Sequence, residues 1–459
     1  NIWNKENENY FKYNNVLPFC LLDQSNKRIM ELAEQPLLLL MLAMYDADGN
    51  SLAKLKNEIK RTQLYNNLLR RFVLRERKRY NGFLNLSSNE KLVIINNEMR
   101  RLGVVAIGMY NRQTVYIHSN ELENDLKFYS LHRERKKEVK GKKLNDSESL
   151  LAGFFFIHES KAKDEETGNE GLENAYEFLH NTFGEFLTAD FILNCATYEI
   201  CRINTYKTTP SLSSELLKLQ TNEVWLNKEW YSCLMFTPLY TRTVVLEMMQ
   251  EHKAKVIKDN NLDEKVFCDC FKFIVENELK KMLNYRCFPS VMYEDNLFER
   301  DMSLLECISV YTMNLIILAS VLCPDGFKFD EKNYVDNYNP DENISSWRKL
   351  CSLWRSCFSE KDLTGLASIV KANRIDESNL QIISNEKFES MPYKNLVDIT
   401  LCVSFALSET FNIGLTGFHS RHPLEILKMN LEEYLCYYKN NYPAFYIQLL
   451  INMLNIEIN

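Results

Sequence analysis

The sequence predicts a mainly α protein of several domains. Glycine and proline, the residues that most often interrupt helices, number only 13 and 10 among 459 residues, against averages of about 7% and 5%. Long stretches repeat apolar residues every three or four positions, which is the period of an amphipathic helix. At about 150 residues per domain, the length allows roughly three domains.

The composition indicates an ordinary folded protein in a reducing compartment. Apolar residues make up 46% and charged residues 25% of the chain. The 13 cysteines are scattered and odd in number, so we expect a cytoplasmic protein without a disulfide framework. Residues 308–323 form the longest apolar run, but it is shorter than the ~20 residues that a membrane span needs. We therefore expect a buried core helix there and no membrane partner.

Residues 1–80 predict a small helical domain. One apolar helix ends at a turn over residues 46–50, and a second helix is expected to begin near Ser51 and to continue to about residue 79. In this second helix the pairs Leu64/Tyr65, Leu68/Leu69 and Phe72/Val73 keep a helical period.

Residues 81–200 predict a second domain, which begins with a capped helix. Ser87 and Glu90 have the spacing of a capping box, which marks a helix start. The apolar positions that follow at steps of three and four are Leu92, Ile95, Met99, Leu102, Ala106 and Met109. We expect all six to be buried.

Strands follow this helix. A short strand over residues 114–118 leads into a helix with Leu122 and Leu126. After a basic insertion at residues 133–143, two apolar strands (154–158 and 175–180) flank a polar loop, which predicts a β-hairpin. Helix, strand, helix and hairpin in this order make a winged-helix-like domain.

Residues 201–459 predict an irregular all-helical region with a sensory or regulatory role. Trp347, Leu350, Cys351 and Trp354 stand at helical spacing and are expected to form a buried stripe. No internal repeat is present at solenoid periods.

The segment 175–192, AYEFLHNTFGEFLTADFI, contains the candidate site residue His180. Thr182 and Glu185 have the spacing of a second capping box, which predicts a helix start at about Thr182. His180 would then lie at the positive end of a helix, where unsatisfied N–H groups attract anions. The residues alone leave two roles open for it: a phosphate donor, or a core histidine bonded to a nearby carbonyl.

This segment resembles the end of the winged-helix domain of NACHT-type STAND P-loop NTPases, which carries the pattern F-x-H-x-(S/T)-F-x-E-F-x-A-A. The matching residues are Phe178, His180, Thr182, Phe183, Glu185, Phe186 and Ala189, with Thr188 where the pattern has alanine. ELAEQPLLLLMLA (residues 31–43) is similar to the small lid domain of the same family, with Pro36 at the proline beside adenine. The resemblance covers residues 25–200.

The resemblance implies a nucleotide-gated switch. In that family the lid and winged-helix domains close over a nucleotide held by an upstream P-loop core, and the winged-helix histidine contacts the ADP phosphate. His180 would thus sense phosphate, Pro36 would pack on adenine, and ATP or ADP with Mg²⁺ would be bound in the parent protein. The implied partners are the N-terminal NTPase core, an unknown protein trigger at the C-terminal region, and other copies of the chain after activation. Bacterial members of the family often act in antiviral defence.

The chain is not expected to hydrolyse ATP by itself. No G-x-x-x-x-G-K-[ST] motif is present, and the nearest string, from Gly103 to Gly108, continues with Met109 and Tyr110 inside a predicted helix. It lacks the lysine and hydroxyl that hold phosphate and Mg²⁺. The first residue, Asn1, is not methionine, so we expect a C-terminal part of a larger protein with its P-loop upstream.

Two other classes are open. A winged helix can bind nucleic acid, and residues 133–143 hold seven Lys/Arg. The loop 159–174, however, carries six acids and two lysines, and the net charge is −7, which argues against phosphate as a partner. Loss of a salt-dependent DNA shift on neutralising Lys136, Lys137, Lys142 and Lys143 would identify such binding.

The third class is a hydrolase with a site at residues 419–422, His-Ser-Arg-His. This cluster has no acidic or cysteine partner at metal-ligand spacing. Cys268 and Cys270 likewise have no second pair at zinc spacing. We expect no catalytic residue and no metal site in this chain.

Overall fold

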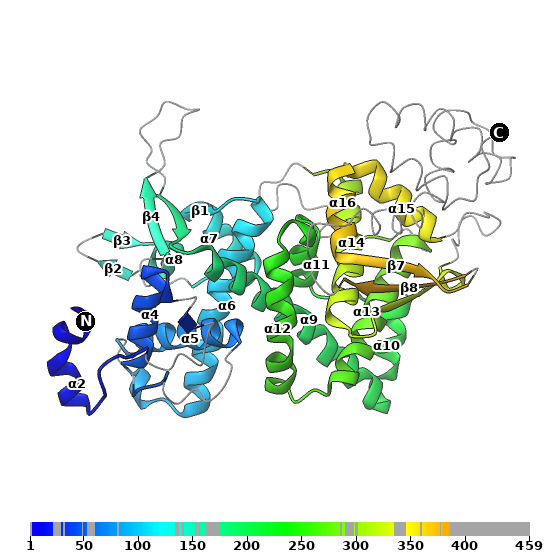
Figure 1. Ribbon diagram of the computed structural model, residues 1–459. Coiled ribbons are helices and arrows are strands. Elements are labelled where there is room, and N and C mark those ends of the chain that lie inside the picture. Colours follow the sequence, from blue (N-terminus) through cyan, green and yellow to red (C-terminus); the bar gives the residue numbers. More distant parts are fainter. Residues whose placement is uncertain are drawn as a thin grey trace, which may run out of the picture. The chain divides into compact units, whose positions relative to one another are not determined.

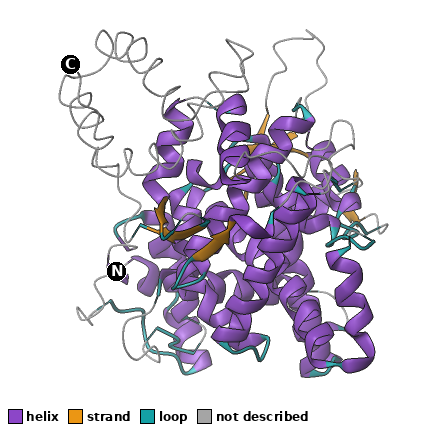
Figure 2. Ribbon diagram, turned by 90° about the vertical axis from the view of Figure 1, so that its right-hand side faces the viewer, coloured by secondary structure: helices purple, strands orange, loops and turns teal. Residues whose placement is uncertain are grey.

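Figure 1 shows the computed structural model of the chain as a ribbon. Helices predominate (Figure 2), which confirms the predicted mainly α class. The structure describes residues 2–21, 29–30, 33–47, 49–52, 60–79, 82–133, 137–139, 142–151, 154, 157–161, 174–221, 223–284, 287–289, 298, 302–334, 346–358, 360–376 and 378–385.

The chain divides into two compact units. Unit 1 comprises Asn1–Cys195 and Val244–Asp259, and unit 2 comprises Ala196–Thr243 and Asn260–Asn459. The boundary falls within one long helix, α9 (Asn181–Thr208). Helix α12 (Thr243–Asp259) belongs to unit 1 except for its first residue, although the chain on both sides of it belongs to unit 2. The finer division at residue 80 stays a prediction, because residues 1–80 and 81–195 both fall in unit 1.

Unit 1 consists of helices and short strands. In chain order before α9 they are α1 (Ile2–Glu6), α2 (Glu8–Asn14), α4 (Pro36–Asp46), α5 (Arg61–Lys78), η1 (Phe83–Asn85), α6 (Ser88–Arg112), β1 (Tyr116–His118), α7 (Ser119–Phe128), β2 (Lys137–Val139), β3 (Lys142–Leu144), α8 (Asp146–Leu151), β4 (Ile157–Lys161) and β5 (Asn174–Phe178).

Helix α5 begins later than the sequence predicts. Ser51 and Leu52 lie in a turn, Lys60 is extended with φ −65° and ψ 141°, and the helix starts at Arg61. The prediction of a helix from Ser51 was therefore wrong. The stripe within α5 is confirmed, because Leu64, Tyr65, Leu68, Leu69, Phe72 and Val73 are all buried.

The capping box at the start of α6 is confirmed. The Ser87 side chain accepts the backbone N–H of Glu90, and the Glu90 carboxylate accepts the N–H of Ser87 at 2.8 Å. The predicted buried face is only partly right. Met99, Leu102, Ala106 and Met109 are buried, whereas Ile95 is half-buried and Leu92 is 51% exposed.

A small antiparallel sheet lies beside these helices, with the strand order β1-β5-β4. Ile157 pairs with Phe178 and Lys161 with Asn174, so β4 and β5 form the predicted hairpin. The first strand lies at 157–161 and not at 154–158, and the second ends at Phe178 and not at His180. The single strand β1 pairs on the other edge of β5, with Ile117 opposite Tyr176. This order of helix, strand, helix and hairpin is the one that the sequence predicts for residues 81–200.

Unit 2 contains the second half of α9 and the elements that follow it. These are η2 (Pro210–Leu212), α10 (Ser213–Gln220), α11 (Lys228–Leu234), η3 (Leu239–Thr241), α13 (Glu264–Leu283), α14 (Leu304–Leu322), β6 (Phe327–Asp330), η6 (Glu331–Asn333), α15 (Ser346–Cys357), α16 (Glu360–Ile369), β7 (Val370–Arg374) and β8 (Asn379–Ser384).

Helix α14 forms the core of unit 2. By length and composition it could cross a membrane, and among the described residues it is the one helix that passes this test. In the structure every residue of this helix from Cys307 to Leu322 is buried. The amide of Asn314 on this helix donates to the carbonyls of Leu234 and Thr237, at 2.8 and 2.9 Å. The side chains of α14 are thus satisfied by protein neighbours, as expected for a core helix.

The prediction that residues 201–459 are all-helical was wrong, because unit 2 also contains a sheet. Strands β6, β8 and β7 form an antiparallel sheet in that order, with Phe329 opposite Leu380. The predicted stripe on α15 is confirmed, since Trp347, Leu350, Cys351 and Trp354 are each at most 2% exposed. The predicted loop 159–174 is shorter in the structure, because Glu159–Lys161 lie in β4 and Asn174 lies in β5. The rest of that loop and the cluster at 419–422 lie outside the described residues.

Candidate functional site

His180 is the residue that directly precedes α9. It is half-buried, and its backbone carbonyl accepts the N–H of Phe183 at 3.1 Å. The first turn of a helix leaves its N–H groups without helical partners and carries partial positive charge. His180 therefore stands where a helix attracts anions, as the sequence predicts.

The imidazole of His180 caps this helix. Its Nδ1 accepts the backbone N–H of Thr182 at 3.3 Å and lies 2.6 Å from the Thr182 hydroxyl. The Thr182 hydroxyl in turn accepts the hydroxyl proton of Tyr65, from α5, at 3.0 Å. The bond between Tyr65 and Thr182 thus joins α5 to α9, and Thr182 also bonds His180.

The capping box predicted at Thr182 and Glu185 is wrong. Helix α9 begins at Asn181, so Thr182 already lies inside the helix. Its hydroxyl bonds Nδ1 of His180 in place of a backbone N–H of the first turn. The ring nitrogen supplies the acceptor that a capping hydroxyl would otherwise supply.

Aromatic packing fixes the position of Tyr65. The side chain is 1% exposed, and its ring meets Phe183 edge-on at 5.4 Å and Phe186 at 6.0 Å. Burial raises the pKa of Tyr65, so the phenol keeps its proton at neutral pH. The hydroxyl that bonds Thr182 is therefore a neutral donor in a rigid setting.

Helix α12 contacts the same elements. Glu247 pairs with Arg61 at 3.2 Å, and Glu251 accepts the backbone N–H of Thr62 at 3.4 Å, so two carboxylates of α12 bind the first turn of α5. On the α9 side, the ring of His252 meets Phe186 edge-on at 5.2 Å. A helix from the predicted sensor region thus touches the residues beside Tyr65.

Pro36 is the other predicted site residue. It is the first residue of α4, where a proline fits because that position needs no N–H donor. Its ring is exposed. No hydrogen bond or ring contact in the described part of the chain joins Pro36 to His180. Helix α5 contacts the helices of both residues. It packs against α4, which begins with Pro36, and its Tyr65 bonds Thr182 at the start of α9.

These two residues fit the nucleotide contacts that the resemblance implies. With Nδ1 occupied as an acceptor, Nε2 is the ring nitrogen of His180 that can donate to a phosphate oxygen. Burial lowers the pKa of His180, which favours the neutral ring. The exposed ring of Pro36 can pack against a flat base. The remaining phosphate contacts would have to come from outside this chain.

The string from Gly103 to Gly108 has a packing role. Both glycines lie inside α6. A Cβ on Gly103 would stand 2.7 Å from the ring of Phe191, and one on Gly108 would stand 2.5 Å from a carboxylate oxygen of Asp125. Close helix packing therefore explains this spacing of glycines.

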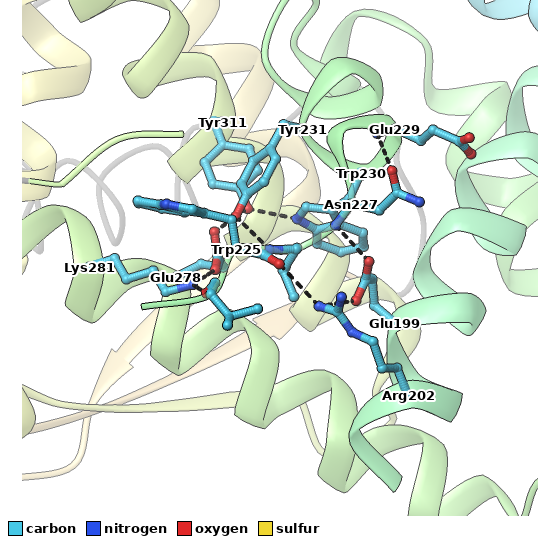
Figure 3. A network of polar contacts seen from close by, with 12 residues as sticks. Glu199, Arg202, Trp225, Asn227, Glu229, Trp230, Tyr231, Glu278, Lys281 and Tyr311 are labelled. Carbon is cyan, nitrogen blue, oxygen red and sulfur yellow. Dashed lines mark hydrogen bonds and ion pairs between the residues drawn. The ribbon is translucent and has the colours of Figure 1, made fainter. Parts of the chain in front are cut away.

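A second polar cluster lies in the interior of unit 2 (Figure 3). Lys281 and Glu278 on α13 form an ion pair of 2.8 Å in which each side chain is 1% exposed. Glu278 also accepts the hydroxyl of Tyr311 at 2.9 Å, and Tyr311 accepts the indole N–H of Trp230 at 2.7 Å. Burial raises the pKa of Tyr311 well above its ordinary value.

This cluster holds the backbone of the segment before α11. Four consecutive residues each bond a different side chain: the Val224 carbonyl accepts from Lys281, the Trp225 carbonyl accepts from Arg202, the Leu226 N–H donates to Tyr231, and the Asn227 N–H donates to Glu199. Two acids and two bases balance each other. Glu278 pairs with Lys281, and Glu199 pairs with Arg202 at 2.7 Å. The network therefore stabilises the loop.

A third charged cluster bears on the nucleic-acid alternative. The buried carboxylate of Glu98 pairs with Arg77 and Arg133 and lies 3.6 Å from Arg101. Burial acts to raise the pKa of Glu98, but the three guanidinium groups outweigh it and hold that pKa below its usual range. Arg133, the first residue of the basic run, is thus used in a structural ion pair.

The remaining candidates are the two cysteines on α13, the lysines of the basic run and the cluster at 419–422. Cys268 and Cys270 are buried on α13, and within the described residues no group of three or more His, Cys, Asp or Glu could hold a metal ion. Lys137 lies in β2, while Lys142 and Lys143 lie in β3. Lys136 and the residues from His419 to His422 lie outside the described residues.

The sequence did not reveal the contributions of Tyr65 and His252. Tyr65 appeared only as one member of the apolar stripe of α5, because periodicity shows which face is buried and not what a hydroxyl touches. His252 contacts Phe186 and Asp190 of α9, but it lies on a helix distant in sequence, so no spacing could connect these residues.

The chain was compared with family models, with curated proteins and with solved structures, and none of the three comparisons found a match.

Proposed function

We propose that this chain is the regulatory part of a nucleotide-gated switch of the NACHT type within the STAND NTPases. The P-loop core would precede it, and His180 would donate from Nε2 to a phosphate of ADP bound in that core. Pro36 would pack on the adenine. The observation that carries this proposal is the hydrogen bonding of His180. Thr182, at the start of α9, occupies Nδ1, which leaves Nε2 as the nitrogen that can donate.

Helix α12 supports the switching part of the proposal. It belongs by sequence to the predicted sensor region and by contact to unit 1. A protein trigger that displaces α12 would release Arg61 and Thr62 at the start of α5. Since α5 also carries Tyr65, the release would reach the bonds of His180. Loss of the phosphate contact would then allow ATP exchange and self-association, as expected of a two-state element that couples two sites.

The test uses the parent protein, with its upstream segment, purified and assayed for retained nucleotide. We expect co-purified ADP, and we expect His180→Ala to speed ADP release by about ten- to a hundredfold, the value of a hydrogen bond to a charged group. Asn194→Ala, an exposed position on the same helix, is the control. Unchanged release from His180→Ala, or a parent protein without a P-loop, would refute the proposal.

The nucleic-acid alternative predicts a different result. There the chain would shift duplex DNA in a salt-dependent way, and the shift would need Lys136, Lys137, Lys142 and Lys143. We favour the nucleotide switch because Arg133, which opens the basic run, is bound to Glu98.

A further inference from the structure

The hydrogen bonds around His180 determine which of its nitrogens carries the proton. A backbone N–H can only donate, so the N–H of Thr182 requires a lone pair on Nδ1. The Thr182 hydroxyl lies 2.6 Å from Nδ1 and accepts a hydrogen bond from the Tyr65 hydroxyl on its oxygen. Its own O–H is therefore free to donate a hydrogen bond to Nδ1. In a neutral imidazole with an unprotonated Nδ1, the proton lies on Nε2.

Tyr65, the first donor in the series from Tyr65 through Thr182 to His180, is held rigidly. Tyr65 is wedged against Phe183 and Phe186 and is 1% exposed, so its hydroxyl has little freedom to turn away from Thr182. Three charged groups influence the pKa of the Tyr65 hydroxyl electrostatically: Arg61 on α5, Glu185 on α9 and Glu251 on α12. None of the three takes part in the bonds between Tyr65, Thr182 and His180.

We propose that Tyr65 and Thr182 are positioning residues that hold His180 in the tautomer with its proton on Nε2. Tyr65 orients the Thr182 hydroxyl, and Thr182 supplies two donors to Nδ1. Neither residue touches the ligand. The use of this tautomer to hold a phosphate oxygen of a nucleoside diphosphate rests on the proposed function, whereas the tautomer itself does not.

The arrangement also shows how α12 could act on the histidine. Tyr65 follows Arg61 and Thr62 by one helical turn, and these are the residues that Glu247 and Glu251 of α12 bind. Movement of that turn would carry the Tyr65 hydroxyl away from Thr182. The Thr182 hydroxyl could then donate elsewhere, and Nε2 would no longer be the fixed donor.

The test is a ring-nitrogen NMR measurement on the full chain without nucleotide. The chain is labelled with ¹⁵N-histidine, and the His180 signals are assigned by their loss in His180→Gln. We expect protonated Nε2 and unprotonated Nδ1 in the wild type at neutral pH. Thr182→Val, which keeps the shape and removes the hydroxyl, should change the tautomer ratio by about two- to tenfold.

Three further variants separate positioning from folding. Tyr65→Phe should move the ratio in the same direction as Thr182→Val, and Thr182→Ser should restore the wild-type ratio. Thr205→Val, whose exposed hydroxyl bonds a carbonyl of its own helix, should leave His180 unchanged. The signals of the other six histidines report whether each variant is folded.

The results can overturn the inference independently of the proposed function. A wild-type proton on Nδ1, or a folded Thr182→Val chain with an unchanged tautomer ratio, would contradict it. If the tautomer is as expected but His180→Ala retains ADP normally in the parent protein, the proposed function fails and the positioning role stands.

Discussion

His252 on α12 places its Nε2 2.9 Å from Oδ1 of Asp190 on α9. The histidine is 2% exposed, and no described residue bonds its Nδ1. Because a buried polar group costs free energy unless it is paired, this contact anchors α12 to the rest of unit 1. It is the same helix that binds the first turn of α5.

The first prediction concerns that anchor. Asp190→Ala leaves His252 buried without its acceptor and should destabilise unit 1 by about 1–3 kcal/mol. Backbone amides of α12 should exchange faster with deuterium, which mass spectrometry of the α12 peptides would detect. Asp259→Ala, which removes a half-exposed partner of Lys255 at the end of the same helix, should change neither quantity. Equal exchange in the two variants would show that the pair does not anchor α12.

The second prediction compares two neighbouring lysines on α13. Lys281→Met leaves Glu278 as an unpaired buried charge and should cost about 3–5 kcal/mol. Lys280→Met breaks a half-buried pair with Glu276 at the surface of the helix and should cost at most about 1 kcal/mol. Urea unfolding followed by tryptophan fluorescence measures both, because Trp225 and Trp230 lie at this site.

A double variant sharpens this comparison. Lys281→Met with Glu278→Leu removes both charges and should be more stable than Lys281→Met alone, since burying an unpaired charge costs more than losing the pair. If the double variant is the less stable one, the hydrogen bond from Tyr311 to Glu278 matters more than the charge.

The third prediction tests the close packing of α6. Alanine is favoured over glycine in a helix interior by about 1 kcal/mol, but the Cβ of Gly103→Ala would meet the buried ring of Phe191 at 2.7 Å. Overpacking of this kind costs about 1–3 kcal/mol, so we expect a net loss of stability. Gly184→Ala, with its nearest neighbour atom at 3.0 Å, should be closer to neutral. A stabilised Gly103→Ala chain would show that α6 and Phe191 lie further apart.

The fourth prediction is a pH dependence. Burial lowers the pKa of His180 below its ordinary value of 6.5, so the unfolded chain takes up a proton first as the pH falls. The stability that the neutral ring contributes is present above pH 6.5 and is lost as the pH falls from there through the folded-state pKa. The urea midpoint of the wild type minus that of His180→Gln should therefore decline across this window. A difference that stays constant with pH would contradict the prediction.

Local signals in the sequence predicted the local structure. The capping box at Ser87 and Glu90, the stripe on α5 and the stripe on α15 each depend on residues within two or three turns of one another. A helix forms its hydrogen bonds within one segment, so its start and its buried face can be read from spacing. The mainly α class follows from the same signals and from the scarcity of glycine and proline.

Tertiary structure decided the details that depend on distant residues. Thr182 has the spacing of a helix cap, yet it donates to His180 because Tyr65, 117 positions away, occupies its oxygen. Leu92 continues the apolar period of α6 but remains exposed, because period alone does not supply a partner surface. In the sheet of β6, β8 and β7, β6 pairs with a strand that follows it by about 50 residues, and α12 returns to unit 1 from a distant part of the chain. The sequence by itself identified His180 at an anion-attracting helix end. Which of its ring nitrogens carries the proton depends on the hydroxyl of Tyr65, which only the folded chain brings near.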